Sequence, residues 1–200
     1  FVLINLLLSL QLLNNLTYLI LRLISLILYM VPRRINIKFG KIFGYLMYYV
    51  FPLRKSVART NLNIAFRTKE NKYINSLLLN VYRHYGILTF EFLRMHSKKI
   101  QFGNFIIDNK TKNILANKSG IILMTAHLGN WEMIPSIINK YKKVTGIVRE
   151  QKNSGGNKFF SECRAIKNVS LIPNKGSKRK MLKALHDGEI LLLATDQNAK

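Results

Sequence analysis

Four short apolar runs in the second half of the chain constrain its fold most strongly. They cover residues 121–125, 144–149, 169–172 and 190–195, and helix-like segments at 131–141, 157–167 and 178–186 separate them. Strands and helices that alternate at this spacing are typical of parallel β-sheets covered by helices. We therefore predict an α/β fold with a mainly parallel central sheet flanked by helices. Pro135 predicts a kink or a late start for the first of these helices.

The first apolar run leads directly into a group of polar residues. The segment 121–132 reads IILMTAHLGNWE, so His127, Asn130 and Glu132 follow the strand closely. Ligands of open α/β sheets bind at the carboxyl ends of the strands. Gly129 allows a tight turn there, and Asn130 suits the N-cap of the next helix. Glu132 can then hold one ring nitrogen of His127 while the other accepts a proton, although a structural histidine is also common at such spacing.

The string HLGNWE resembles the His-x4-acid signature of glycerolipid acyltransferases, in the HxGNWE form of the lipid A biosynthesis lauroyl/myristoyl acyltransferase family. The similarity extends over most of the chain, and it includes Asn61-Leu62 with Phe66 and the segment YGILTFEFLRM. It implies an O-acyltransferase in which His127 is the general base and Glu132 orients it, with no cofactor and no covalent enzyme intermediate.

The same resemblance implies substrates. The donor would be a fatty acyl thioester of acyl carrier protein, and the acceptor would be a hydroxyl of an anionic glycolipid, the lipid A precursor Kdo-lipid IVA, in lipopolysaccharide biosynthesis. Another glycolipid, such as a phosphatidylinositol mannoside, remains as an alternative acceptor.

Further site residues follow from the family pattern. Arg149 ends the second predicted strand, where the family has an arginine that would hold a phosphate or the developing oxyanion. Arg164 lies in SECRAIKN, which is similar to an R-x-x-G turn although Asn168 replaces the glycine. Asp196-Gln197 matches a D-Q pair that would organise the site. The predicted substrate-binding residues are Asn130, Arg149, Arg164 and Asp196, with surface arginines as the alternative reading. The histidines show no ligand spacing, so no metal is expected.

The first 31 residues predict a membrane-associating helix. They are mostly Leu and Ile with Arg22 as the one charged residue, and about 20 apolar residues suffice to cross a bilayer. A spanning helix, a monotopic helix and a buried core helix all remain open. Pro32 and several basic residues follow, so by the positive-inside tendency we expect the rest of the chain to stay on the cytoplasmic side. With the family resemblance, the expected membrane is the bacterial inner membrane. We predict an anchor at 1–31 and an acyltransferase domain at 32–200 that continues beyond the last residue given.

Charge narrows the choice of partners. The chain has 32 Lys and Arg against 9 Asp and Glu, a net charge of +23, which suits nucleic acid, anionic lipid or an acidic protein. One basic cluster could face lipid phosphates or acyl carrier protein, or could be a solvated helix face; it consists of Lys175, Lys178, Arg179, Lys180 and Lys183. A membrane-tethered nucleic-acid-binding protein is the alternative from another class, but no nucleic-acid-binding signature is present and we expect no such partner.

Three further segments carry predictions. Apolar residues at three- and four-residue steps predict a long helix over 69–95. The aromatic-rich patch 39–51 suits either the membrane interface or packing on the first helix. The segment NSGGN at 153–157 predicts a flexible loop, and it lacks the pattern of a phosphate-binding loop. Cys163, the one cysteine, has no neighbouring base and is not expected to be a nucleophile.

Overall fold

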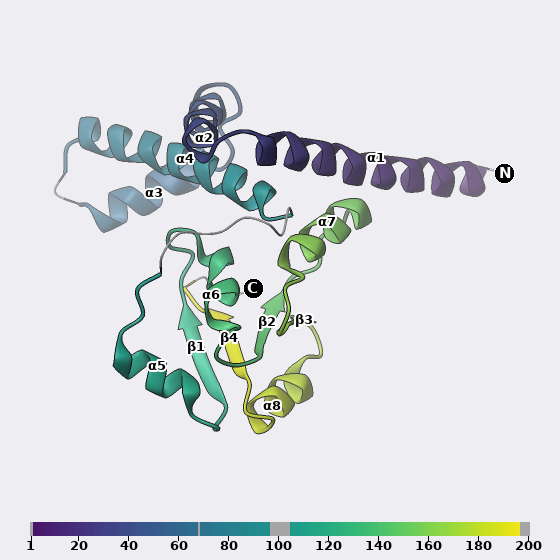
Figure 1. Ribbon diagram of the computed structural model, residues 1–200. Helices are drawn as coiled ribbons and strands as arrows, with labels where there is room; N and C mark the ends of the chain where they lie inside the picture. The colour runs from purple at the N-terminus through teal and green to yellow at the C-terminus, as the bar shows by residue number, and fades with distance from the viewer. Residues whose placement is uncertain (1, 68, 97–104, 197–200) are drawn as a thin grey trace. The chain divides into compact units, whose positions relative to one another are not determined.

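The computed structural model describes residues 2–67, 69–96 and 105–196. The chain forms two compact units: Phe1–Arg22 together with His96–Lys200, which we call the sheet unit, and Leu23–Met95, which we call the helical unit. The boundary between them falls inside the first helix, α1 (Val2–Met30). Figure 1 labels the elements of both units.

A four-stranded sheet forms the centre of the sheet unit (Figure 1). Its strands are β1 (Ile121–Thr125), β2 (Val144–Val148), β3 (Val169–Pro173) and β4 (Ile190–Ala194), in the order β1-β4-β2-β3. All of the strand pairings are parallel. The predicted α/β class with a parallel sheet is confirmed, and each strand begins at the residue that its apolar run predicts.

The inner strand β4 is buried on both faces of the sheet, whereas the edge strand β1 leaves Ile122 and Met124 of one face exposed at 54% and 69%. Ile190 of β4 packs with Val144 of β2 and with residues of two helices, Leu115 of α5 (Asn109–Ala116) and Ile138 of α6 (Ile134–Ile138). Leu191 points to the opposite face, because side chains alternate along a strand, and it is only 1% exposed. Burial on both faces is the usual state of parallel sheets.

Pro135 delays the helix that follows the motif. The chain first forms the short 3-10 helix η1 (Trp131–Met133), and α6 then begins at Ile134. This start puts Pro135 in the first turn of α6, where a missing N–H leaves no helical hydrogen bond unmade. The predicted late start is therefore confirmed.

The segment NSGGN begins a helix, so the prediction of a flexible loop is wrong. Helix α7 runs over Ser154–Arg164, and the side chain of Asn153 accepts a hydrogen bond from the backbone N–H of Gly156 at 2.7 Å. An asparagine at the N-cap satisfies one of the otherwise unpaired amides of a first helical turn. Helix α8 (Lys178–His186) has the bounds that the sequence predicts.

Glycine at position 155 allows the backbones of α7 and α1 to meet within the sheet unit. A Cβ on Gly155 would lie 1.8 Å from the backbone oxygen of Asn14, whereas a Cβ on Gly156 would find its nearest neighbour at 3.5 Å. The side chain of Asn153 also donates to Thr17 Oγ1 at 3.4 Å. The contact between the two helices is therefore made by backbone and by short polar side chains.

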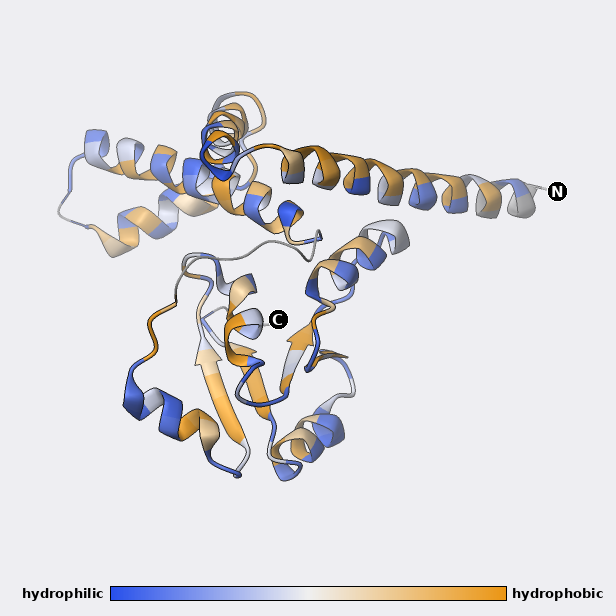
Figure 2. Cartoon of the chain, viewed as in Figure 1, coloured by the Kyte–Doolittle hydropathy of each residue, from blue (hydrophilic) through white to orange (hydrophobic). Residues whose placement is uncertain are grey.

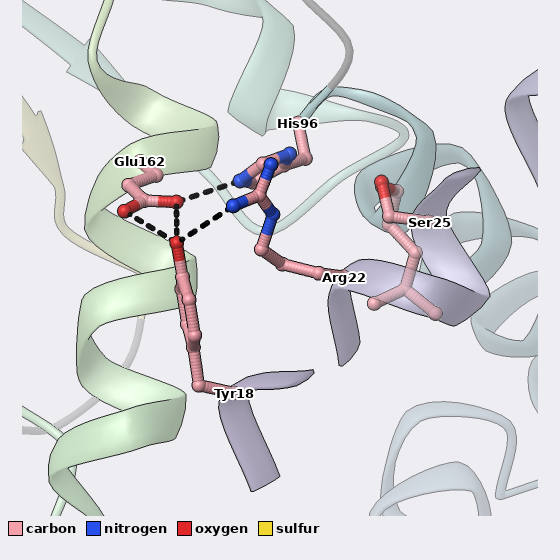
Figure 3. A network of polar contacts seen from close by, with 6 residues as sticks. Tyr18, Arg22, Ser25, His96 and Glu162 are labelled. Atoms are coloured by element: carbon pink, nitrogen blue, oxygen red, sulfur yellow. Dashed lines mark hydrogen bonds and ion pairs between the residues drawn. The ribbon is translucent and has the colours of Figure 1, made fainter. Parts of the chain in front are cut away.

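A polar network next to this contact joins the same two helices (Figure 3). The Tyr18 hydroxyl donates to the carboxylate of Glu162 at 2.8 Å, and His96 Nε2 lies 2.7 Å from Glu162 Oε2. The His96 ring stacks on Phe159 with 4.9 Å between centroids. Burial would raise the pKa of Glu162, but the hydrogen bonds from His96 and Tyr18 hold that pKa below its usual range. Glu162 therefore stays ionised and keeps the first part of α1 on α7.

Most of the apolar side chains of α1 are exposed. Asn14, Thr17 and Tyr18 are partly covered, whereas many leucines and isoleucines and Met30 are exposed along the helix, together with the polar Gln11, Asn15 and Arg22. Over Leu8–Met30 the helix is long and apolar enough to cross a membrane, by length and composition (Figure 2). A helix of a water-soluble protein usually buries its apolar side chains, and α1 leaves most of its apolar side chains exposed.

The helical unit is built on the packing of α2 (Arg33–Tyr49) against α4 (Asn71–Arg94). Glycines make the crossing very close: a Cβ on Gly86 of α4 would lie 2.1 Å from the backbone oxygen of Gly40 of α2. Tyr48 and Leu78 continue the contact, and α3 (Lys55–Ala65) packs beside α4. The long helix predicted at 69–95 is confirmed as α4.

Gly155→Ala should loosen the first part of α1 from α7, because an added methyl group meets the backbone oxygen of Asn14. Overpacking of this kind costs about 1–3 kcal/mol, so the melting temperature in detergent should fall. Gly156→Ala is the matched control: it has room for the methyl group, and alanine favours a helix over glycine by about 1 kcal/mol. Equal melting temperatures for the two variants would contradict the close approach.

Candidate active site

Strand pairing brings together two residues that lie far apart in the sequence. β1 and β4 are parallel neighbours, with Thr125 level with Ala194. The next hydrogen bond of this ladder runs from the Thr195 amide to the Thr125 oxygen at 3.1 Å. His127 follows β1 and Asp196 follows β4, so both lie at the carboxyl edge of the sheet, where ligands of α/β folds bind.

Asp196 holds His127 through two hydrogen bonds. Its Oδ1 lies 2.7 Å from Nδ1 of the His127 ring, and its Oδ2 accepts from the His127 backbone amide at 3.0 Å. These bonds hold the pKa of Asp196 below its usual range, so it is a carboxylate at neutral pH. Since a carboxylate only accepts hydrogen bonds, Nδ1 carries the proton and Nε2 of a neutral ring is left as the proton acceptor.

Glu132 does not occupy the place next to His127 that the spacing suggests. Both of its carboxylate oxygens bind Arg164 from the last turn of α7, at 2.8 Å from Nε and 2.5 Å from Nη2. The expectation that Glu132 orients His127 is therefore corrected: in this structure Asp196 does so. The reason is that Glu132 lies in η1, where a guanidinium on a neighbouring helix offers a stronger, two-bond partner than an imidazole.

The Glu132–Arg164 pair is half-buried and forms a fixed charged group beside the histidine. Burial would lower the pKa of Arg164, but the hydrogen bond and the charge of Glu132 raise it above its ordinary value. The guanidinium therefore stays positive. Both residues were predicted to belong to the site, but their pairing was not predicted, because they are 32 positions apart and meet only in the folded chain.

The turn after β1 has the geometry that its glycine predicts. Gly129 has φ of +61°, in the left-handed region that glycine adopts without strain. Asn130 lies at the N-cap position of η1, although its side chain makes no capping hydrogen bond. Trp131 follows, and its ring lies edge-on to the His127 ring with 4.7 Å between centroids. No role was predicted for Trp131 from the sequence, although its place inside the HLGNWE motif indicates that it belongs to the site.

A cavity of about 310 Å³ opens between these groups. His127, Trp131, Glu132 and Arg164 line one part of it, and Arg149 lines another. Apolar side chains from β2, β3 and β4 complete its wall: Ile147, Val148, Val169, Leu171 and Leu192. The cavity thus combines one proton acceptor and two guanidinium groups with an apolar wall, an arrangement suited to an acyl group next to an anion. Asn130 is described but is not part of the lining.

Cys163 is buried, and burial raises its pKa to about 12, so it is a neutral thiol and no nucleophile.

The predicted basic cluster lies outside the cavity lining. The residues of the basic cluster are exposed on α8 and in the loop before it, and Lys183 of this cluster pairs with Asp187 at 2.6 Å. Glu91, which matches the family pattern, pairs with Arg33 inside the helical unit. Gln197 lies outside the described residues.

Glu132→Gln should destabilise the sheet unit, because it leaves the half-buried Arg164 charge with a neutral amide as its partner. A cost of about 1–3 kcal/mol is expected for an unsatisfied charged partner, seen as a lower melting temperature in detergent. Glu150→Gln, at an exposed position, is the matched control and should melt like the wild type. Equal melting for both variants would contradict a structural Glu132–Arg164 pair.

Comparison with known proteins agrees with the site. The family model of bacterial lipid A biosynthesis acyltransferases matches residues 8–200, which include every residue of the site. No curated protein matches the chain. The match covers nearly the whole chain, so it is not limited to the HLGNWE motif. The chain belongs to the bacterial lipid A biosynthesis acyltransferase family, and it is an acyltransferase of lipid A and lipopolysaccharide biosynthesis.

Proposed function

We propose that the protein transfers a fatty acyl chain from an acyl carrier protein thioester to a hydroxyl of the lipid A precursor Kdo-lipid IVA. The observation that carries the proposal is the histidine at the carboxyl edge of the sheet, whose Nδ1 is held by Asp196 at 2.7 Å while the ring borders the cavity. A histidine that is held in this way is a preorganised general base. The family match supports an acyl acceptor in lipid A biosynthesis.

Transfer proceeds in a single encounter of the two substrates. Nε2 of His127 removes the proton of the acceptor hydroxyl while the hydroxyl oxygen attacks the thioester carbon. The C–S bond of the tetrahedral intermediate then breaks, and the leaving sulfur takes the proton from the imidazolium. Asp196 stabilises the positive ring between these steps, as the acid does in a catalytic triad. The buried, neutral Cys163 takes no part.

The guanidinium groups of the cavity provide the positive charge that this reaction needs. Arg164 is fixed by Glu132, so its position costs no rearrangement when the oxyanion forms. Arg149 lies on another part of the lining, at the end of β2, where it binds an anionic group of the substrate. In this account Glu132 acts as a positioning residue for Arg164. Asn130 remains a proposed substrate-binding residue by its place in the motif.

The surfaces outside the cavity fit the proposed partners. Exposed basic side chains of α8 suit an acidic acyl carrier protein, and three of them precede the paired Lys183: Lys178, Arg179 and Lys180. The apolar outer face of α1 suits a lipid bilayer, since α1 is long enough to cross one. We place the enzyme at the bacterial inner membrane with the parallel sheet on the cytoplasmic side, where basic residues concentrate next to membrane helices.

His127→Ala should abolish the gain of one acyl chain when membranes containing the protein receive acyl carrier protein thioester and tetra-acylated, Kdo-bearing precursor. Asp196→Asn should lower the rate by about 10²- to 10⁴-fold, because an amide no longer fixes the Nδ1–H tautomer. Product mass identifies the reaction, and the initial rate gives the effect of each variant. Glu150→Gln, on the exposed surface, is the control and should retain the wild-type rate.

Different failures of this assay have different meanings. Acylation of another glycolipid, with none of Kdo-lipid IVA, would keep the chemistry and overturn the proposed acceptor. A wild-type rate in His127→Ala would overturn the mechanism. A wild-type rate in Asp196→Asn with a large loss in Glu132→Gln would return the orienting role to Glu132.

Arg149→Ala should lower kcat/KM by about 10- to 100-fold, because a charged hydrogen bond contributes about 1.5–3 kcal/mol. A higher KM with unchanged kcat would indicate that Arg149 binds an anion of the substrate, and a lower kcat would indicate that it stabilises the oxyanion. Lys152→Ala is the matched control, a nearby exposed cation outside the cavity lining. Equal kcat/KM values for the two variants would show that Arg149 is a solvated surface residue.

A further inference from the structure

Helix α2 carries an exposed apolar stripe that the packing of the helical unit leaves uncovered. The stripe consists of Ile35, Phe39, Ile42, Leu46 and Tyr49, whose steps of four and three residues place them on one side of the helix. These side chains are between 42% and 67% exposed. The stripe continues past the end of the helix with Val50 at 57%, Phe51 at 63% and Leu53 at 75%.

The packing of α2 explains why this stripe cannot turn inward. Another side of the helix, with Asn36, Gly40, Gly44 and Tyr48, is already buried. Its glycines contact the backbone of α4, since a Cβ on Gly44 would lie 2.5 Å from the backbone oxygen of Tyr82. Asn36 donates to the backbone oxygens of Leu28 and Val31. Rotation about the helix axis would break these contacts.

A row of cations runs along α2 beside the stripe. Arg34, Lys38 and Lys41 each directly precede a residue of the stripe, so they lie about 100° around the helix from it. Arg33 is different, because it pairs with Glu91. Among the residues that the structure describes, Arg34, Lys38 and Lys41 have no carboxylate partner. The outward part of α2 thus joins an apolar stripe to unneutralised positive charge.

We infer that α2 lies in the plane of a membrane, with its apolar stripe among the acyl chains and its cations on anionic lipid headgroups. An amphipathic helix with a basic polar side and large apolar side chains binds in this way. Four charged residues between Arg33 and Lys41 prevent α2 from crossing the bilayer. The aromatic rings at its carboxyl end, Tyr49 and Phe51, suit the headgroup level.

Charge favours lipid over a second copy of the chain as the occupant. The sequence has no Asp or Glu before Glu70, so self-association through this surface would bring cations together without acidic partners. The inference rests on the membrane association proposed above, but it concerns α2 and not α1. It also assigns the exposed side of the patch 39–51 to the membrane interface, one of the two alternatives that the sequence left open, while the other side of the patch packs on α4.

A fluorescent label at Ile42→Cys tests the inference in the full chain. The environment-sensitive dye NBD attaches to the new thiol, because Cys163 is buried. In vesicles of phosphatidylcholine and phosphatidylglycerol, emission should shift to the blue, and nitroxide-labelled lipid chains should quench it severalfold more than the same dye at Ser76→Cys. Ser76 is the matched control, an exposed residue of α4 that lies away from the buried stripe of that helix. Phe39→Cys, on the same stripe, repeats the measurement if Ile42→Cys alters the fold.

Charge reversal completes the test. Lys38→Glu with Lys41→Glu should reduce the quenching at position 42, since each cation adds about fivefold to binding at an anionic surface. Equal quenching at positions 42 and 76 would overturn the inference. So would protection of the dye without lipid, whether by acyl carrier protein or by raised protein concentration. Co-sedimentation with vesicles reports on α1 separately, so a protein that sediments with a water-exposed dye would refute the role of α2 alone.

Discussion

The parallel pairing of β1 with β4 is the constraint on which the site depends. It places the residues after both strands at one edge, so that Asp196 meets both the backbone amide and the ring of His127. The pairing is itself fixed by burial, because Ile190 and Leu191 of β4 fill opposite faces of the sheet. A shift of β4 by one residue would make Ile190 and Leu191 exchange faces and repack both sides of the strand. The same shift would move Asp196 away from His127, so the register of β4 sets both the packing and the catalytic geometry.

Close helix contacts organise both units around glycine. In the sheet unit Gly155 accepts the backbone of α1, and in the helical unit the glycines of α2 and α4 accept one another. Such contacts pack two helices together through glycine and backbone atoms, without burying their bulky side chains. The leucines of α1 and the apolar stripe of α2 are consequently left on the outside. This distribution fits a protein whose outer surface meets lipid, where apolar side chains carry no penalty.

Local patterns predicted the elements well and their partners poorly. The apolar runs placed all four strands, and the spacing of apolar residues placed α4. The alternation of strand-like and helix-like segments placed α8. The segment NSGGN has the composition of a loop but begins a helix, because Asn153 caps the first turn and Gly155 makes room for the backbone of Asn14, which is far away in the sequence. The residues of the site were named from the motif and the family pattern. Which acid meets His127 depends on strand order, and no spacing along the chain contains that information.

Nitrogen-15 NMR of the imidazole rings in detergent micelles shows whether Asp196 fixes the tautomer of His127. His127→Gln assigns the signals among the four histidines. At a pH where the ring is neutral, we expect a protonated Nδ1 and an unprotonated Nε2, with this preference lost in Asp196→Asn and kept in Glu132→Gln. A ring protonated at Nε2, or a tautomer that changes with Glu132 and not with Asp196, would show that Asp196 does not hold the ring.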